Sequence, residues 1–328
     1  MELDEPPVLR YGSFYSGIEA PLQALQSLLA WSGVTLRHEF AVESDKHCVA
    51  AMRANYHCER LLEQDVATLD MRTLPRVDVF VAGFPCQPYS IIGKQLGAQD
   101  ERADGWIHCV AYCRVARPAL VLLENVAAFQ RDQDGATLQR LKTALHQECG
   151  YAMIDHAVLD ALDYGSCQHR ERLFILAALD AETAARWKWP TPRPTCHVPF
   201  CALLEPEAAA QESLYITQTR LDYMDRRRVK MTSSCRVLDA RNADLVPCLC
   251  AAHRFNCYNH MIRELDGRVR MISMREALRL MGFSDDFRIV CSRIQTMKQA
   301  GNSMSVQVMQ ALLHSALVAL RFVNYEQT

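Results

Sequence analysis

The chain has 328 residues, with 36 Lys and Arg against 38 Asp and Glu, for a formal net charge of −2. Half of the residues are hydrophobic and 23% are charged, which excludes intrinsic disorder as the main state. No apolar stretch approaches the ~20 residues that span a bilayer, so the composition also excludes a membrane protein. The near-zero net charge neither favours nor excludes nucleic acid as a partner, because a local basic face is enough to bind it.

The N-terminal residues and the cysteines indicate the compartment. Residues 1–5 are acidic and lack the basic-then-apolar order of a signal peptide. The 14 cysteines fall well below the ~8–10% of a disulfide scaffold. We therefore expect an intracellular protein with free thiols.

The first half of the chain alternates strand-like and helix-like segments. Five runs rich in apolar residues are predicted to be strands: 8–14, 37–42, 77–82, 119–123 and 172–177. Pro21 suits the first turn of a helix after the first strand, and Ser44 or Asp45 can cap a helix after the second. Runs that are apolar on both faces suit a parallel sheet. The alternation predicts an α/β fold with a doubly wound, mostly parallel sheet.

This pattern ends near residue 186. Residues 187–199 contain two Trp and four Pro, which is typical of a connecting segment. From about residue 200 to 268 the periodicity is weak and a basic cluster occupies residues 226–230, so we expect a second, smaller domain. Helical periodicity returns at residues 274–281, with Gly282 as a stop signal. The last predicted helix places these residues on one face: Val306, Met309, Leu313, Leu317 and Leu320.

Several polar residues follow predicted strands, where ligands of an open parallel sheet bind. Gly17 follows the first strand and allows a ligand to approach the backbone, although a tight turn without a ligand explains it equally well. Glu43 ends the second strand and is placed to accept hydrogen bonds from a ribose. Asp65 follows a short third strand and could bind an adenine amino group. Each carboxylate taken alone is also typical of a solvated loop.

The most specific loop is residues 83–90, Gly-Phe-Pro-Cys-Gln-Pro-Tyr-Ser. Its Cys86 stands at the tip of a strand and is displayed between Pro85 and Pro88. A nucleophilic cysteine must be partly thiolate, which requires nearby positive charge or a helix dipole. The structural alternative is a small buried hydrophobic residue, the usual role of a cysteine. The two prolines favour the nucleophile.

Two further segments carry charged or amide side chains. Glu124 ends a wholly apolar strand, where a carboxyl group can act as a general acid. Gln168, Arg170 and Arg172 alternate just before the last strand, so a strand would place all three on one face. The structural alternative for this second group is a surface ladder of salt bridges.

Taken together, these segments resemble the cytosine-5 methyltransferase family, enzymes that methylate cytosine in DNA with S-adenosylmethionine. The matching segments occur in the family's order, at residues 15–18, 83–95, 124–126, 164–172, 275–283 and 299–303. They span nearly the whole chain, and the loop around Cys86 is the most specific of them. The resemblance implies a Rossmann-like methyltransferase domain.

The resemblance also implies a set of catalytic residues. Cys86 would add to carbon 6 of a cytosine that has been flipped out of the duplex, which activates carbon 5. Glu124 would bind ring N3 and Arg172 the O2 oxygen. Arg170 would hold this constellation, and Gln87 would close over the flipped base.

The cofactor implied by the resemblance is S-adenosylmethionine. Its implied binding residues are Tyr15, Gly17, Ile18, Glu43, Asp65, Val66, Pro85, Asn302 and Met304. Tyr15 would stack on the adenine, and Glu43 would bind the ribose hydroxyls. The chain departs from the family at Glu19 and Ala20, where many members have Gly-Gly, and at Ser44, where a bulky side chain often covers the adenine.

By the same resemblance, residues 1–180 plus 269–328 form the S-adenosylmethionine-binding catalytic domain, and 181–268 the target-recognition domain. The candidate DNA-binding residues are Ser90, Arg226, Arg228, Lys230 and Arg254. A basic run is also typical of a solvated face. We expect the partner to be double-stranded DNA with a cytosine-containing site, with no membrane involved. We also expect a monomer that works in a bacterial cytoplasm or a eukaryotic nucleus.

Three alternatives remain open on sequence grounds. The most metal-like cluster is Cys248, Cys250, His253, Cys257 and His260, but its spacing is not a standard zinc arrangement, and we expect no metal. A catalytically silent relative that binds nucleic acid would lack Cys86, Glu124 or Arg172, and all three are present. An RNA (tRNA) cytosine-5 methyltransferase would carry a different sequence after the Pro-Cys-Gln core, which favours DNA.

Overall fold

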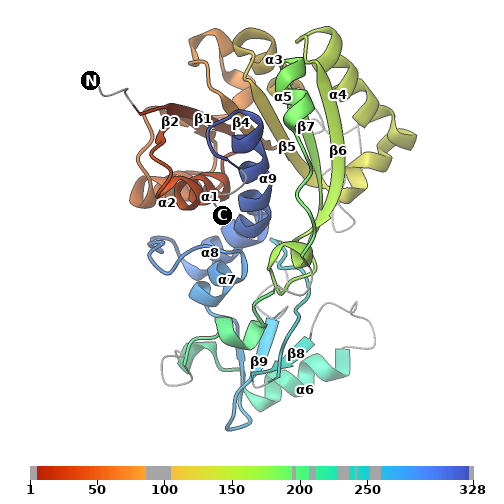
Figure 1. Cartoon of the computed structure of the whole chain (residues 1–328). Coiled ribbons are helices and arrows are strands. Elements are labelled where there is room, and N and C mark those ends of the chain that lie inside the picture. The colour runs from red at the N-terminus through yellow and green to blue at the C-terminus, as the bar shows by residue number, and fades with distance from the viewer. Residues whose placement is uncertain are drawn as a thin grey trace. The chain divides into compact units, whose positions relative to one another are not determined.

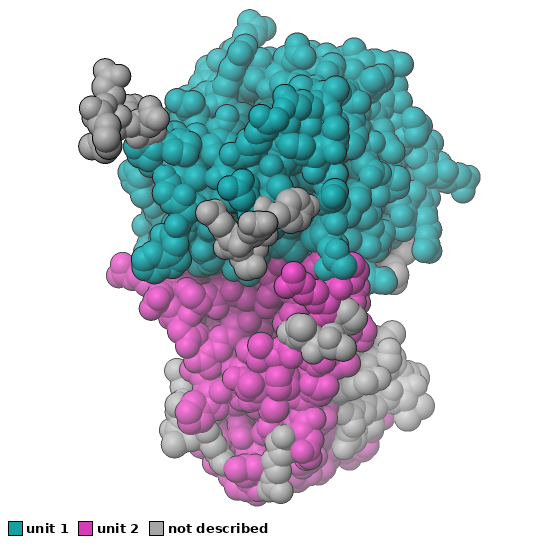
Figure 2. Space-filling view, in the orientation of Figure 1, with its two compact units in different colours: residues 1–159, 171–191, 308–328 teal, residues 160–170, 192–307 magenta. Residues whose placement is uncertain are grey.

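The computed structural model describes residues 6–85, 105–193, 197–206, 212–227, 236–240, 242–251 and 260–324. Their contacts divide the chain into two compact units, coloured separately in Figure 2. The first unit comprises residues 1–159, 171–191 and 308–328, and the second comprises residues 160–170 and 192–307. These bounds differ from the predicted boundaries at 181 and 268, because the segment 269–307 packs within the second unit. The assignment of a target-recognition domain stays a prediction.

In the first unit, seven strands of the described residues form one sheet in the order β3-β2-β1-β4-β5-β7-β6 (Figure 1). They are β1 (Val8–Phe14), β2 (Thr35–Glu43), β3 (Leu61–Glu63), β4 (Val79–Gly83), β5 (Leu120–Val126), β6 (Met153–Asp160) and β7 (Glu171–Ala178). Neighbouring strands from β3 to β5 are parallel. The predicted α/β class and mostly parallel sheet are confirmed.

One strand departs from the sequence-based expectation. The segment predicted at 172–177 forms β7, but it runs antiparallel to β5. Burial on both faces had suggested a parallel strand. In the structure β7 lies between β5 and β6 inside the sheet, so it is buried on both faces whatever its direction.

Helices cover both faces of this sheet. They are α1 (Ala20–Leu29), α2 (Lys46–Asn55), α3 (Gly105–Ala116), α4 (Ala136–Gln147), α5 (Ala181–Arg186) and, from residue 308 onward, α9 (Val306–Ala319). On β2, Phe40 packs in a cluster with Tyr112 of α3, whereas Ala41 packs with Met52 of α2. Successive side chains of a strand point to opposite faces, so α2 and α3 cover opposite sides of the sheet. This is the doubly wound arrangement that the alternation predicts.

The second unit contains a three-stranded sheet and three helices among its described residues. These are β8 (Arg236–Asp239), β9 (His260–Arg263), β10 (Val269–Met271), α6 (Gln218–Arg227), α7 (Met274–Leu280) and α8 (Arg293–Asn302). The helix predicted at 274–281 is confirmed as α7. Gly282 follows it with a φ of +86°, the left-handed conformation expected of a helix stop.

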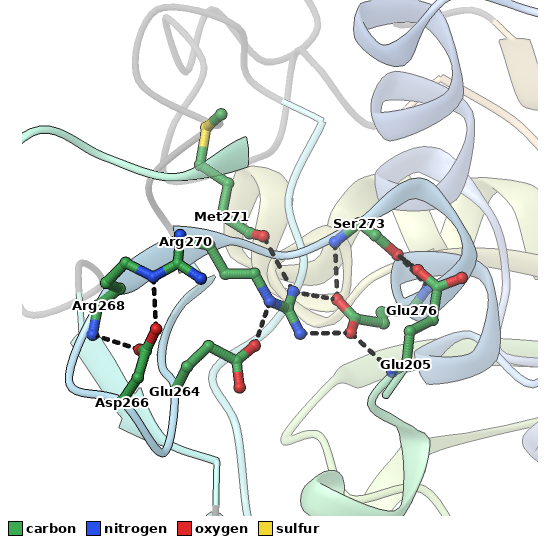
Figure 3. A network of polar contacts seen from close by, with 8 residues as sticks. All are labelled: Glu205, Glu264, Asp266, Arg268, Arg270, Met271, Ser273 and Glu276. Carbon is green, nitrogen blue, oxygen red and sulfur yellow. Dashed lines mark hydrogen bonds and ion pairs between the residues drawn. The ribbon is translucent and has the colours of Figure 1, made fainter. Parts of the chain in front are cut away.

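A buried charge network joins β10 to the start of α7 (Figure 3). Arg270 is completely buried and pairs with Glu264 on one side and with Glu276 on the other. The two Arg270–Glu276 hydrogen bonds measure 2.8 Å each. Glu276 also accepts a hydrogen bond from the Ser273 backbone N–H at 2.7 Å, and Ser273 caps α7 in return. The Glu276 carboxylate therefore binds Arg270 of β10 and completes the N-terminal cap of α7.

Within the described residues, no helix combines the length and the apolar composition needed to cross a membrane.

Candidate active site

The strands β1 to β5 are parallel, so their carboxyl ends meet at one edge of the first unit's sheet. At this edge, Gly17 has a φ of +56° in the loop between β1 and α1. A Cβ built on Gly17 would have no atom of the described residues within 4 Å, so among these residues the loop has open space beside it. The Gly17 N–H donates to Glu43 Oε2 at 2.9 Å, and the Asp45 N–H donates to Oε1 at 2.7 Å. Glu43 thus connects the end of β2 to this loop.

The electrostatics of Glu43 fit a polar ligand. Burial raises the pKa of Glu43, and the N–H groups of Asp45 and Gly17 oppose that rise. A carboxylate has about four acceptor positions, so these two bonds leave capacity for hydroxyl groups. The open side of Gly17 and this carboxylate together fit the ribose and the adjoining chain of a nucleoside cofactor.

Three other predicted cofactor residues follow strands at the same edge, and the exposure of their side chains differs from one to the next. Asp65 is exposed after β3, and its side chain accepts the Ala67 N–H at 3.0 Å. Ile18 and Val66 are only 1% and 2% exposed. Their side chains belong to the core, so any contact with a ligand would be made by their backbone.

Tyr15 and Pro85 pack around the first residue of α3. The Tyr15 hydroxyl donates to the Gly105 carbonyl at 3.2 Å. A Cβ on Gly105 would lie 2.8 Å from Pro85 Cδ, so only glycine fits there. Burial raises the pKa of Tyr15, which keeps its hydroxyl protonated as a donor. These contacts bring together the residues on either side of the segment 86–104, which contains Cys86, Gln87 and Ser90 and lies outside the described residues.

The predicted acid and its arginine lie on neighbouring strands. Arg172 Nε of β7 is 3.1 Å from Glu124 Oε1 of β5, and the two side chains are 20% and 13% exposed. In the ladder Arg172 is opposite Val126 and Glu124 is opposite Phe174, so the pair is diagonal. Both groups can therefore be held in place and still reach a bound substrate.

Sequence reasoning gave no role to Asn125, which connects this pair to the catalytic loop. Asn125 is completely buried, and its Nδ2 donates to the Phe84 carbonyl at 3.2 Å. Its Oδ1 accepts the Val126 N–H at 2.8 Å. The residue before Cys86 is Pro85, so Asn125 fixes the backbone that leads into the predicted nucleophile. The available signal was an amide side chain near the end of an otherwise apolar strand, next to Glu124.

Gln168 and Arg170 differ from the predicted face shared with Arg172. The strand β7 begins at Glu171, so alternation along a strand does not apply to the two residues before it. Both are buried in the second unit, where Gln168 Oε1 accepts the Leu249 N–H at 2.7 Å. Arg170 donates to the carbonyls of Leu249, Gly301 and Ser303, at 2.9, 3.0 and 2.6 Å. Arg170 therefore binds backbone carbonyls of the second unit, and its role in holding the catalytic residues stays a prediction.

The remaining cofactor residues, Asn302 and Met304, also belong to the second unit. Asn302 is the last residue of α8 and is exposed, whereas Met304 is half-buried. A Cβ on the preceding Gly301 would lie 2.5 Å from the Cys250 backbone carbon. Close packing thus requires that glycine, and Arg170 holds the carbonyls on both sides of Asn302.

The predicted DNA-binding residues are described only in part. Arg226 is exposed on α6, where its Nε donates to the Asp222 carbonyl at 3.2 Å. Arg228, Lys230 and Arg254 lie outside the described residues.

The cysteine and histidine cluster is also described only in part. His253 and Cys257 lie outside the described residues. Cys248 Sγ accepts a hydrogen bond from Arg170 at 3.3 Å. Where the structure describes the chain, no three His, Cys, Asp or Glu side chains are placed to hold a metal ion.

Comparisons with known proteins give a consistent result. The family model described as "C-5 cytosine-specific DNA methylase" matches residues 13–317. The chain is 32% identical over 276 residues to Type II methyltransferase M.NgoBI of Neisseria gonorrhoeae, covering 83% of each chain. It is 26% identical over 330 residues to Type II methyltransferase M.HhaI of Haemophilus parahaemolyticus, covering 97% of each. The crystal structure of S. pombe Dnmt2 methyltransferase matches with a TM-score of 0.72 at 18% identity, over 95% of this chain and 99% of that one, a likeness of fold.

Proposed function

This chain belongs to the C-5 cytosine-specific DNA methylase family, and we propose that it methylates carbon 5 of cytosine in double-stranded DNA through a covalent bond to Cys86. S-adenosylmethionine, the methyl donor of this family, supplies an electrophilic methyl group when bound. The observation that carries the proposal is the Glu124–Arg172 pair, with 3.1 Å between Nε and Oε1. Asn125 ties the strand of Glu124 to the backbone just before Cys86.

The chemistry explains why these residue types are needed. Carbon 5 of neutral cytosine is a poor nucleophile. The Cys86 thiolate forms a bond to carbon 6, and the displaced electrons are stabilised as Glu124 protonates N3 and Arg172 donates to O2. Carbon 5 would then bond to the methyl group with the electron pair of the ring, and the electrons of the broken bond would stay with the group that carried the methyl. Loss of the carbon 5 proton to water returns an electron pair to the ring, which re-forms the double bond and expels the Cys86 thiolate. The N3 proton then returns to Glu124.

The substrate geometry requires a flipped base. In a duplex, N3 is engaged in base pairing and carbon 6 is stacked, so Cys86 and Glu124 could not reach them together. We propose that the base leaves the helix, and that residues of the predicted recognition segment, including Arg226, contact the flanking DNA. The exposed position of Arg226 on α6 supports a phosphate contact.

Toward the cofactor, the proposed role of this chain's residues is to bind it and to orient it. We propose that Glu43 accepts the ribose hydroxyls and that the open side of Gly17 receives the methionine portion. Asp65 would accept the adenine amino group. Asn302 and Met304 are the other proposed cofactor-binding residues. Two observations support this assignment. The Glu43 carboxylate accepts two backbone N–H groups and has acceptor positions left for hydroxyl groups, and no described atom lies within 4 Å of a Cβ built on Gly17.

A mechanism-based trap tests the proposal. A DNA duplex carrying 5-fluorocytosine has no proton to lose from carbon 5, so the Cys86 adduct should accumulate when S-adenosylmethionine is added. We expect a denaturation-resistant protein–DNA band from the wild-type chain and none from Cys86→Ala. Methyl transfer to cytosine by Cys86→Ala would contradict the covalent mechanism.

The same assay with RNA tests the substrate. Genomic DNA and total RNA are treated with the enzyme and sequenced after bisulfite conversion. We expect methylated cytosines in a fixed DNA sequence. Methylation confined to RNA would overturn the assignment of DNA, and leave the chemistry of Cys86 intact.

A further inference from the structure

Glu19 occupies an unfavourable position for its residue type. It begins α1 with a φ of +61°, a left-handed conformation that disfavours any residue with a Cβ. Its side chain is completely buried, and a buried carboxylate is costly unless it is paired. Glu19 also stands where the family resemblance leads one to expect glycine. Two unfavourable features at one residue indicate interactions that hold it in place.

The carboxylate of Glu19 is bound by side chains of two strands. The Tyr11 hydroxyl of β1 donates to Oε2 at 2.8 Å, and the Ser13 hydroxyl donates to Oε1. His38 Nε2 of β2 lies 3.5 Å from the same Oε1. Burial alone would lower the pKa of His38, but the neighbouring Cys58 and Glu19 outweigh it and raise the pKa to about 10. The raised pKa favours the charged form of the His38 imidazole beside Glu19.

This cluster continues into the loop assigned to the cofactor. Ser13 Oγ lies 2.7 Å from Ser16 Oγ, and Ser16 Oγ lies 3.2 Å from both the N and the O of Val42. The Glu19 N–H also donates to the Ser16 carbonyl at 3.0 Å. The next residue after Ser16 is Gly17, whose N–H is bound by Glu43. Hydrogen bonds thus connect Glu19 to the loop without placing Glu19 beside any reacting atom.

We propose that Glu19 is a positioning residue for S-adenosylmethionine, which holds the turn of Ser16 and Gly17 in its binding conformation through Ser13. The inference rests on the proposed function, because that function assigns this loop to the cofactor. Without the carboxylate, the turn spends only part of its time in the binding conformation. The apparent affinity for the cofactor falls by that fraction, whereas the rate at saturation does not.

Two variants and one control test the affinity. Glu19→Gly permits the left-handed backbone and removes the anchor, and Glu19→Gln keeps the size and removes the charge. The control is Glu39→Gln, a carboxylate on β2 that is 10% exposed and pairs with Arg10 and Arg37. We expect the Kd for S-adenosylhomocysteine and the KM for S-adenosylmethionine to rise about tenfold in both variants, with kcat unchanged within about twofold. The control should keep the wild-type Kd.

Hydrogen exchange of the ligand-free chain gives a readout that needs no activity. The amides of Ser16 and Gly17 are bound to Val42 O at 3.3 Å and to Glu43 at 2.9 Å. Both should exchange faster in Glu19→Gly and not in Glu39→Gln. A double-mutant cycle of Ser13→Ala with Glu19→Gln should be non-additive in Kd, because both act through one chain of bonds.

The outcomes separate this inference from the proposed function. If the wild-type chain itself fails to bind S-adenosylhomocysteine, the cofactor assignment is wrong. The proposed role of Glu19, which depends on that assignment, is then wrong as well. If the wild type binds and both Glu19 variants bind as tightly, Glu19 is a purely structural residue. Fully additive effects of Ser13→Ala and Glu19→Gln on Kd would also overturn the inference, with the methyltransferase function untouched.

Discussion

At the scale of single residues, the Glu124–Arg172 pair depends on the shape of the guanidinium. Arg172 approaches Glu124 through Nε, across a diagonal of two antiparallel strands. Arg172 Nη1 also donates to the Glu171 carbonyl at 2.8 Å. A guanidinium can serve several partners at once, because its donors form a rigid planar fork. An ammonium group is a single point of charge and cannot serve both partners in the same way.

We predict that Arg172→Lys lowers kcat about 10²-fold, the size of effect seen when one donor to a developing negative charge is removed. Binding of S-adenosylhomocysteine should be unchanged. The matched control is Arg114→Lys, which alters an exposed pair with Glu148 in the same unit and should leave kcat unaffected. Single-turnover methylation of a DNA duplex measures the effect. Wild-type kcat in Arg172→Lys would exclude a role for the guanidinium fork.

At the scale of elements, the start of α7 depends on a charge network contributed by separate segments. Glu276 closes the capping box with Ser273 and pairs with Arg270 of β10. The backbone N–H of Glu205 also donates to Glu276, at 2.8 Å. The sequence around Glu276 supported the family resemblance. The structural role of Glu276 follows only from its contacts with Arg270 of β10 and with the distant Glu205. Removing one member leaves buried charges without compensation.

We predict that Arg270→Met destabilises the chain by about 3–5 kcal/mol, because Glu264 and Glu276 would remain buried without their cation. Arg268→Met is the control two residues away. The Arg268 side chain is 49% exposed, and its ion pairs with Asp266 and Glu212 are at the surface, so we expect a much smaller loss of unfolding free energy than in Arg270→Met. Urea unfolding followed by circular dichroism compares the two. Equal losses would mean that the buried network contributes no more than a surface pair.

At the scale of the whole molecule, the predicted site residues come from both compact units. Tyr15, Glu43 and Glu124 belong to the first unit, whereas Arg170 and Asn302 belong to the second. The chain passes from one unit to the other after residues 159, 170, 191 and 307. Each unit is therefore built from segments that are distant in sequence.

The buried His38 makes the stability of the chain depend on pH. Its folded pKa of about 10 lies above the ~6.5 of an unfolded histidine. The ion pair with Glu19 thus stabilises the fold fully below about pH 6.5, and this contribution is lost as the pH rises toward 10. We expect the wild type to lose a few kcal/mol of unfolding free energy over that range, on the order given by the pKa difference. Urea titrations at pH 6.5 and 10 should show that loss. The loss should be smaller in His38→Gln, in which the buried cysteines with raised pKa values still contribute.

Much of the first unit was predictable because its strands are apolar on both faces and alternate with helices. The strands β1, β2, β4 and β5 and the cap at Asp45 follow from local patterns that no distant contact overrides. The direction of β7 was not predictable, since a strand inside a sheet looks the same in either direction. The roles of Gln168 and Arg170 were also missed, because alternation has no meaning outside a strand.

By itself the sequence determined the α/β class, the order of the motifs and their resemblance to cytosine-5 methyltransferases, all of which depend on residue types at short spacing. Only the tertiary structure decided that Arg172 pairs with Glu124, that Asn125 fixes the backbone before Cys86, and that Glu19 is anchored by two strands. The contacts of Arg172 with Glu124, of Asn125 with Phe84 and of His38 with Glu19 join residues far apart in the chain, and those of Tyr11 and Ser13 with Glu19 depend on how the turn after β1 folds back. Their distances and burial arise from the packing of strands and loops, which spacing along the sequence does not contain.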